Sequence, residues 1–309
     1  MGVRKLLGRL PQPLLDRLRT ARKRYRSVRY RARERLHPVR IERPQIEAAL
    51  REAGLGEGDA AFVQAGMSSF GTIEGGPDAV IEAFAQVLGL DGLIAMPSFP
   101  LDRPAVEYLR QDPVFDLLNT PSRMGAISER FRTSEGVVRS LHPTHPVCAR
   151  GPGAEEIVAG HELAQTPFGA GTPFARLIER GAHQVYFGSG VGAITMYHAY
   201  ECLREPPYPI EVFLPKRFEA RCIDVNGEAV VVHTLVHDPR VTVERIDNNP
   251  PLEAQVRERL IRGGMRSVSL GRGEVLAQTL PELLAQFEQM LGEGSTIYPP
   301  ELLAEARVA

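Results

Sequence analysis

Residues 60–96 read AAFVQAGMSSFGTIEGGPDAVIEAFAQVLGLDGLIAM, and this stretch decides the fold. It begins with a short apolar strand, Ala60–Gln64, and a turn of small and hydroxyl-bearing residues, 65–71. A helix is predicted from Pro77 to Leu88, because proline is favoured in the first helical turn and the following glycine can cap the end. Leu93–Met96 is the next apolar strand. The order of strand, turn, helix and strand predicts a layered α/β sheet.

The same alternation continues on both sides of this stretch. We expect further helices at Gln45–Ala53, Ala193–Leu203, Leu252–Ile261 and Pro281–Leu291, the last of them ending the fold, a strand at Gln184–Gly188, and hairpins around Asn226-Gly227 and Gly271–Gly273. No internal repeat or low-complexity linker interrupts the chain after residue 43. The pattern therefore predicts one folded body, residues 44–309.

The charge of the chain is split between a basic leader and an acidic body. Residues 1–43 carry 15 Arg and Lys against 3 acidic residues, a net charge of +12, whereas residues 44–309 carry a net charge of −13. The 309 residues are 43% hydrophobic, which is enough to fill a core and excludes a disordered or fibrous protein. We therefore treat the leader as a segment separate from the body.

Within the leader, apolar residues recur at helical spacing from Leu14 to Leu36. The spacing predicts a basic amphipathic helix that ends near His37 and Pro38. Three roles fit such a helix: packing against this protein or a second subunit, contact with a membrane surface, and nucleic-acid binding. Because the acidic body continues no nucleic-acid footprint, we expect no nucleic-acid partner. No apolar run reaches the length of a spanning helix, so we predict a cytoplasmic protein, at the inner face of the membrane if the leader binds lipid.

Cysteine and histidine spacing argues against a disulfide framework and a metal centre. Cys148, Cys202 and Cys222 lack the spacing of a structural zinc site, and apolar neighbours predict that Cys148 is a buried, unreactive thiol. The segment His142-Pro143-Thr144-His145-Pro146 brings two histidines close together, but its prolines exclude a helical metal motif. We interpret it as a structural or ligand-lining loop and predict no metal site.

Two glycine-rich turns and one helical pair are candidates for chemistry. The turn Gly66–Gly71 lets backbone NH groups approach a phosphate or an oxyanion. Gly188–Ala193 matches G-x-G-x-x-A, but a dinucleotide-dependent oxidoreductase would carry this motif in its first unit, not past the middle. His198 and Glu201 fall on one helical face, where the carboxylate can orient the imidazole as a general base. The alternative for each glycine-rich segment is an ordinary turn without a ligand. The alternative for His198 and Glu201 is a surface pair without a catalytic role.

Read together, the motifs of this chain resemble those of the aminoglycoside 3-N-acetyltransferase family, which is unrelated in fold to the GNAT acetyltransferases. The matching segments, in order, are Ser68–Gly71 with Gly75-Gly76, Met96-Pro97, Phe115-Asp116, Thr120–Ile127, Arg139–Pro143, Gly151-Pro152, Gly171–Pro173, Thr195–Glu201 and Tyr208-Pro209. Their order and spacing run from about residue 45 to residue 291. No single motif identifies the family; the series does.

The resemblance implies an acetyl-CoA-dependent N-acetyltransferase with an α/β/α sandwich of the antibiotic acetyltransferase type. His198 would deprotonate the substrate amine, with Glu201 orienting the imidazole or holding the substrate, and the acetyl group would pass directly to the amine. The segments similar to those that line the CoA site of the family contain Ser68, Ser69, Phe70, Arg123, Met124, Gly125 and His142, and Thr195 would lie near the thioester.

Two segments depart from the family pattern. Gln64-Ala65-Gly66 stands where the family usually has His-Ser-Ser, and Ala193, Ile194 and Met196 replace polar residues near the base. A polyhydroxylated polycation needs more polar partners than these. We expect the acceptor to be a primary amine of an amino sugar, either an aminoglycoside or a surface-polysaccharide or natural-product sugar. The first alternative is a catalytically silent CoA- or ligand-binding scaffold. The second, which the motifs favour less, is a dinucleotide-dependent oxidoreductase.

Overall fold

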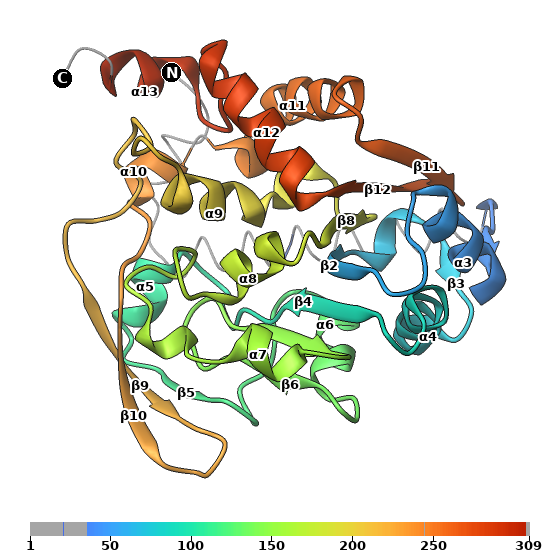
Figure 1. Ribbon diagram of the computed structural model, residues 1–309, viewed down its shortest axis with the longest axis horizontal. Helices are drawn as coiled ribbons and strands as arrows, with labels where there is room; N and C mark the ends of the chain where they lie inside the picture. The colour runs from blue at the N-terminus through green and yellow to red at the C-terminus, as the bar shows by residue number, and fades with distance from the viewer. Residues whose placement is uncertain (1–20, 22–35, 244, 307–309) are drawn as a thin grey trace.

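The computed structural model describes residues 21, 36–243 and 245–306. Within these residues, a central sheet of seven strands runs in the order β11-β12-β8-β2-β4-β7-β6, and smaller sheets β10-β9-β5 and β1-β3 flank it (Figure 1). The strands are β1 (Arg40–Ile41), β2 (Ala60–Ala65), β3 (Thr72–Ile73), β4 (Leu93–Pro97), β5 (Val114–Asp116), β6 (Val138–Arg139), β7 (Val147–Arg150), β8 (His183–Phe187), β9 (Phe218–Ile223), β10 (Ala229–Thr234), β11 (Arg266–Leu270) and β12 (Gly273–Thr279).

Helices cover both faces of the central sheet. They are α3 (Arg43–Glu52), α4 (Gly76–Leu88), α5 (Ala105–Leu109), α6 (Ala126–Arg132), α7 (Ala154–Val158), α8 (Pro173–Glu179), α9 (Thr195–Leu203), α10 (Pro239–Thr242), α11 (Pro250–Arg262), α12 (Leu280–Gly292) and α13 (Pro300–Ala306). Short 3-10 turns are η1 (Met67–Ser69), η2 (His161–Leu163), η3 (Val191–Ala193) and η4 (Ile246–Asn248).

Strand β2 shows how the sheet separates two hydrophobic cores. Ala61 and Val63 face the core that α3, α4 and α6 cover, whereas Ala60 and Phe62 face the core that α7, α8, α9, α11 and α12 cover. Successive side chains of a strand point to opposite faces, so a strand covered on both faces is apolar throughout. The predicted layered α/β/α sandwich is therefore confirmed.

Two differences between the expected and the observed helices matter for the fold, whereas the remaining expected helix bounds differ by at most two residues. The helix predicted to begin at Ala193 begins at Thr195, because Val191–Ala193 forms the 3-10 turn η3. The helix predicted at Pro281–Leu291 is present as α12, but it does not end the fold, because α13 follows it. Proline at the first position of α13 favours helix initiation, and Leu303 is 3% exposed against the core.

At the N-terminal side, the packed body includes residues before the expected boundary at residue 44. Arg40 and Ile41 form β1, which pairs in parallel with β3, and Ile41 is buried. The amphipathic helix predicted from Leu14 to Leu36 lies almost entirely outside the described residues. Among the residues that the structure describes, no helix is both long enough and apolar enough to cross a membrane.

The hairpin β9-β10 extends from the main body (Figure 1), and buried polar side chains lie where it joins that body. Arg139 is buried and donates hydrogen bonds to the carbonyls of Ser98 and Thr120, both at 2.7 Å. His142 Nε2 is hydrogen-bonded with the hydroxyl of Thr234 in β10 at 3.1 Å. Buried polar groups are costly unless they are paired. The bond between His142 and Thr234 therefore ties β10 to the segment after β6, whereas Arg139 ties β6 to the segments after β4 and β5.

The turn after β8 needs a glycine. Gly188 has a φ of +66°, and a Cβ atom there would lie 2.3 Å from Ser69 Oγ and 2.4 Å from the ring of Phe70. Ser69 Oγ also donates a hydrogen bond to the carbonyl of Gly188 at 2.9 Å. The close approach joins the turn after β2 to the turn after β8, and both turns lead into the site.

We expect Gly188→Ala to lower the free energy of unfolding by about 2 kcal/mol more than Gly181→Ala, because both add left-handed strain but only Gly188→Ala adds a clash. Gly181 is a matched control, since its φ is +69° and a Cβ there would meet nothing within 4 Å. Urea unfolding of the two variants measures the difference. Equal losses would show that the turn has room for a side chain.

Candidate active site

A pocket of about 650 Å³ opens where the parallel strands β2 and β8 end. Gln64 lines it from the end of β2, and Ser189 and residues 192–195 line it from the turn after β8. Ligands bind at the carboxyl ends of strands in open α/β sheets, because neighbouring turns diverge there. The pocket therefore lies where the topology favours a ligand.

The end of β2 holds the start of α9 in place. Ser189 Oγ donates a hydrogen bond to the carbonyl of Gln64 at 2.9 Å. The side-chain amide of Gln64 donates in turn to Thr195 Oγ1 at 3.0 Å and to the carbonyl of Ala193. These contacts fix the first turn of α9, which carries His198 into the wall of the pocket.

His198 and Glu201 form a buried pair on α9. His198 Nδ1 lies 2.7 Å from Glu201 Oε2, and the hydroxyl of Tyr298 donates to Glu201 Oε1 at 2.6 Å. The side chain of Glu201 is 0% exposed, so these two hydrogen bonds replace the water that a carboxylate would otherwise contact. A carboxylate at Nδ1 places the proton on that nitrogen and leaves the lone pair on Nε2.

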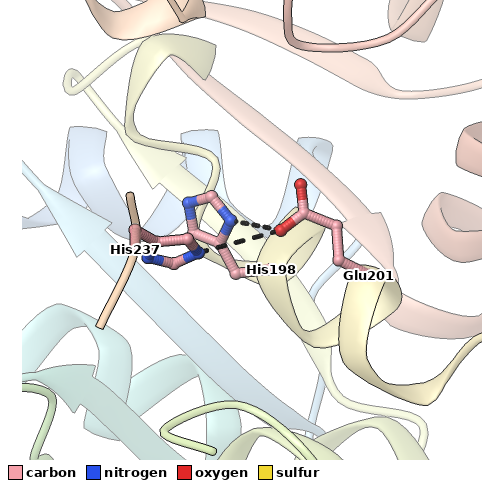
Figure 2. A group of neighbouring side chains, drawn as sticks. All are labelled: His198, Glu201 and His237. Carbon is pink, nitrogen blue, oxygen red and sulfur yellow. Dashed lines mark hydrogen bonds and ion pairs between the residues drawn. The ribbon is translucent and has the colours of Figure 1, made fainter. Parts of the chain in front are cut away.

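His237 approaches the pair from the segment that follows β10. Its ring centroid lies 4.3 Å from that of His198, and its Nε2 lies 3.9 Å from Glu201 Oε2. Figure 2 shows both imidazoles directed at the same carboxylate oxygen. Stacking on Phe213, with ring centroids 4.7 Å apart, holds the His237 ring.

Both imidazoles are neutral at pH 7. Burial, together with the nearby Arg245 guanidinium, holds the pKa of His198 well below its ordinary value. Burial, reinforced by His198, lowers the pKa of His237 to about 3. A neutral imidazole with its lone pair on Nε2 can accept a proton, which is what a general base requires.

A cation also touches the base. Arg245 Nη1 lies 2.6 Å from His198 Nε2, and its Nε and Nη2 donate to the carboxylate of Asp247 at 2.9 and 3.1 Å. Both residues line the pocket, next to η4. The Asp247 carboxylate therefore holds the guanidinium with one nitrogen aimed at the base.

His198, Glu201 and His237 also bring three ligand-type atoms within 4.8 Å of one another. Two ligands on one zinc ion lie roughly 3.3 Å apart, because each metal–ligand bond is about 2 Å. The 2.7 Å between His198 Nδ1 and Glu201 Oε2 is a hydrogen-bond distance instead. The arrangement is that of an oriented imidazole.

Of the residues assigned to the site from sequence, four come together. His198, Thr195 and Met124 line the pocket, and Glu201 lies behind His198. The pair of His198 and Glu201 is in contact, as its helical spacing indicates.

The other six residues assigned to the CoA site lie outside the lining of this pocket. Ser68 and Arg123 are exposed, and Gly125 precedes α6 with a φ of +101°. The other three are held in the fold. Ser69 is hydrogen-bonded to the turn at Gly188, Phe70 packs against Phe187 in the core, and His142 is buried and hydrogen-bonded with Thr234. The assignment of these six residues to CoA stays a prediction.

Several residues of the pocket escape sequence reasoning. His237 and Arg245 reach the site from segments without a motif, and Tyr298 supports Glu201 from the approach to α13. Gln64 is noticeable in the sequence only as a departure from a family pattern. A single histidine or arginine in a loop carries no periodicity, so only the folded chain brings these residues to the pocket.

The fold and the site define an α/β protein in which a neutral, carboxylate-oriented histidine faces a ligand pocket at the ends of parallel strands. A model of the family described as aminoglycoside 3-N-acetyltransferase matches residues 62–292. The chain belongs to this family, as its motifs indicate.

Known relatives agree with this assignment. The chain is 29% identical over 180 residues to aminoglycoside N(3)-acetyltransferase VII of Streptomyces paromomycinus, a match that covers 54% of this chain and 62% of the relative. Among solved structures, aminoglycoside acetyltransferase AAC(3)-Xa superposes with a TM-score of 0.71 at 23% identity, covering 87% of this chain and 99% of that one. The structure of AAC-IIIb with CoA superposes with a TM-score of 0.69 at 25% identity, covering 84% and 98%.

We expect the protein to lose stability as the pH falls from about 6.5 towards 5. Burial lowers the folded-state pKa of His142, His145, His161, His198 and His237, so the unfolded chain takes up protons that the folded chain refuses. Each histidine then removes up to about 1.4 kcal/mol of stability per pH unit below its unfolded pKa. Urea unfolding between pH 7.5 and 5 measures this slope, and a flat profile would contradict it.

Proposed function

We propose that this protein transfers an acetyl group from acetyl-CoA to a primary amine of an amino sugar, with His198 as the general base. The observation that carries the proposal is the orientation of His198: its Nδ1 is held by Glu201, and its Nε2 is directed at Arg245, which lines the pocket with it. Family membership supports acetyl transfer to an amine. The chain spans 62% of the length of the curated Streptomyces relative, so the activity is proposed for this chain on its own residues.

The chemistry follows from what an amine requires. Acetyl-CoA supplies an acyl carbon activated as a thioester. The amine attacks that carbon, its proton passes to His198 Nε2, the C–N bond forms, and the C–S bond breaks to release CoA as a thiolate that recovers the proton. As Nε2 takes the proton, the imidazole becomes cationic, and the Glu201 carboxylate stabilises it through Nδ1. Tyr298 keeps Glu201 in place with its hydrogen bond to the other oxygen.

Two of the residues assigned to CoA are near enough to the base to act on the thioester end. The hydroxyl of Thr195 accepts a hydrogen bond from Gln64, donates to the carbonyl of Ala193 at 3.3 Å, and lies one helical turn before His198 in the pocket wall. We propose that it turns from that carbonyl to donate to the developing oxyanion. Met124 lines the same pocket and would contact the acyl chain. The pocket volume of about 650 Å³ falls within the usual range for small-molecule sites.

The other six residues that the resemblance assigns to the CoA site lie outside the pocket lining. Ser68 and Arg123 are exposed and accessible to a phosphate. Ser69, Phe70 and His142 are engaged in the fold, so their contribution would be to shape the site. Gly125, with its φ of +101°, would let the backbone approach the ligand closely.

Replacing the base tests the mechanism. We expect His198→Ala to lower kcat by about 10²- to 10⁴-fold on any accepted amine while CoA binding stays, because the variant loses proton transfer only. Thiol release from acetyl-CoA measures turnover, and calorimetry measures the Kd for CoA. His233→Ala, at an exposed histidine of β10, is the control.

Three outcomes would contradict the proposal. Near-normal turnover by folded His198→Ala would remove His198 as the base. CoA binding without thiol release across a broad panel of amines would favour a silent scaffold. Stabilisation by a nicotinamide dinucleotide but not by CoA would favour an oxidoreductase.

The basic leader is a separate proposal. Residues 1–43 carry a net charge of +12, and we propose that they dock the enzyme to an anionic membrane surface or to a partner subunit. We expect the full chain to sediment with anionic vesicles, to release them at high salt, and to ignore neutral vesicles. Removing residues 1–35 should abolish sedimentation or change the oligomeric size; unchanged behaviour in both would contradict the proposal.

A further inference from the structure

Arg245 occupies the position that a substrate amine must take. Its Nη1 lies 2.6 Å from His198 Nε2, which is hydrogen-bonding distance, and a neutral imidazole has one lone pair on that nitrogen. A general base must come within hydrogen-bond reach of the proton that it abstracts. Catalysis by His198 therefore requires that Arg245 give up this contact when the acceptor binds.

The surroundings of Arg245 define what could draw it away. Asp247 holds the Nε and Nη2 atoms of the guanidinium, which leaves Nη1 for a ligand once it leaves the imidazole. The adjacent wall is apolar at Ala193 and Ile194. Those two side chains offer no group that could replace the imidazole as a hydrogen-bond partner.

The other Arg, Asp and Glu side chains that line the pocket are Arg103, Asp247 and Glu253. Arg103 is paired with Asp102, and a carboxylate oxygen of Glu253 accepts a hydrogen bond from the backbone of Gly192 at 3.0 Å. His145 and His237 are buried and neutral. An acceptor that carries only positive charge would bring its ammonium beside the Arg245 guanidinium, and like charges at short range repel each other.

We propose that the acceptor carries an anionic group, a carboxylate or a phosphate, close to its amine, and that Arg245 binds this group. The anion accepts the Nη1 hydrogen bond that His198 Nε2 holds in the free protein. The same movement delivers the amine to the freed lone pair. The substrate class is therefore an acidic amino sugar or another anionic primary amine, and the inference rests on the proposed acetyl transfer at this site.

The phosphates of CoA are the other anions in the proposed reaction, and geometry separates them from Arg245. A thioester that reacts at His198 has its sulfur near Nε2, and the full length of the pantetheine arm lies between that sulfur and the pyrophosphate. Arg245 touches Nε2 itself, so it lies at the reacting end. An anion that binds Arg245 therefore belongs to the acceptor and not to CoA.

Matched pairs of amines test the inference. We would compare glucosamine with glucosamine 6-phosphate, ethanolamine with O-phosphoethanolamine, and β-alanine amide with β-alanine, and include gentamicin as a polycation. We expect kcat/KM for the anionic member of at least one accepted pair to be higher by about tenfold or more, as a charge-assisted contact would give. A preference for the neutral members or for gentamicin would overturn the inference.

Variants of Arg245 attribute the preference. Arg245→Gln should bring the ratio of kcat/KM within a pair to within about twofold, Arg245→Lys should restore part of it, and the KM for acetyl-CoA should stay unchanged. Arg240→Gln is the matched control, because Arg240 is an exposed arginine paired with Asp238 in the same segment. Equal losses on both members of a pair in Arg245→Gln, or a raised KM for acetyl-CoA, would overturn the inference and assign Arg245 to the base or to CoA.

A binding measurement separates this inference from the proposed function. Calorimetry of glucosamine 6-phosphate and glucosamine, with the wild type and with Arg245→Gln, needs no turnover. We expect the phosphate to tighten binding in the wild type and not in Arg245→Gln. Failure of every amine to release thiol would refute the proposed transfer, whereas binding without preference for the anion, or a preference that survives in Arg245→Gln, would refute the inference alone.

Discussion

The burial of the Glu201 carboxylate constrains the rest of this site. A charge removed from water needs hydrogen-bonding partners, and this one has two, His198 on the same helix and Tyr298 before α13. His237, from the segment after β10, places its Nε2 3.9 Å from the same carboxylate. Because Tyr298 lies far from Glu201 in the sequence, the second hydrogen bond forms only when the segment before α13 packs against α9. The chemistry of the site and the completion of the fold therefore depend on the same contacts.

Buried polar side chains are also paired with one another beside the pocket. His142 stacks on His161 with centroids 4.4 Å apart, His161 Nδ1 is bonded with Ser140 Oγ at 2.9 Å, and His142 reaches Thr234 in the hairpin. Neutral imidazoles can serve as both donor and acceptor, so they can bridge segments without bringing in a net charge. Cys148, as the sequence predicts, is buried, and burial raises the pKa of its thiol, which removes it as a nucleophile.

Family membership and the departures from the family pattern concern different parts of the site. The pair of His198 and Glu201 belongs to the motif series that carries the resemblance, and the structure brings the two residues into contact. Gln64, Ala193 and Ile194 are departures, and all three line the pocket where an acceptor would bind. Together with Arg245 they are the residues to which we attribute the choice of acceptor, and none of them is the residue that orients the imidazole. This separation is why the reaction type and the acceptor are separate proposals.

The sequence by itself determined a layered α/β sheet, the positions of the longer helices α3, α4, α9, α11 and α12, and the contact between His198 and Glu201, because strand and helix periodicity and the i,i+3 spacing are local. The α/β/α sandwich followed from the resemblance to the family. It did not determine that η3 delays the start of α9 or that α13 follows α12, since both depend on packing against the core. Only the tertiary structure decided that His237 and Arg245 contact the imidazole of His198. It also decided that Tyr298 bonds Glu201 and that Gln64 bonds Thr195. These residues lie in separate segments, and contacts across such distances in the chain leave no periodic signal in the sequence.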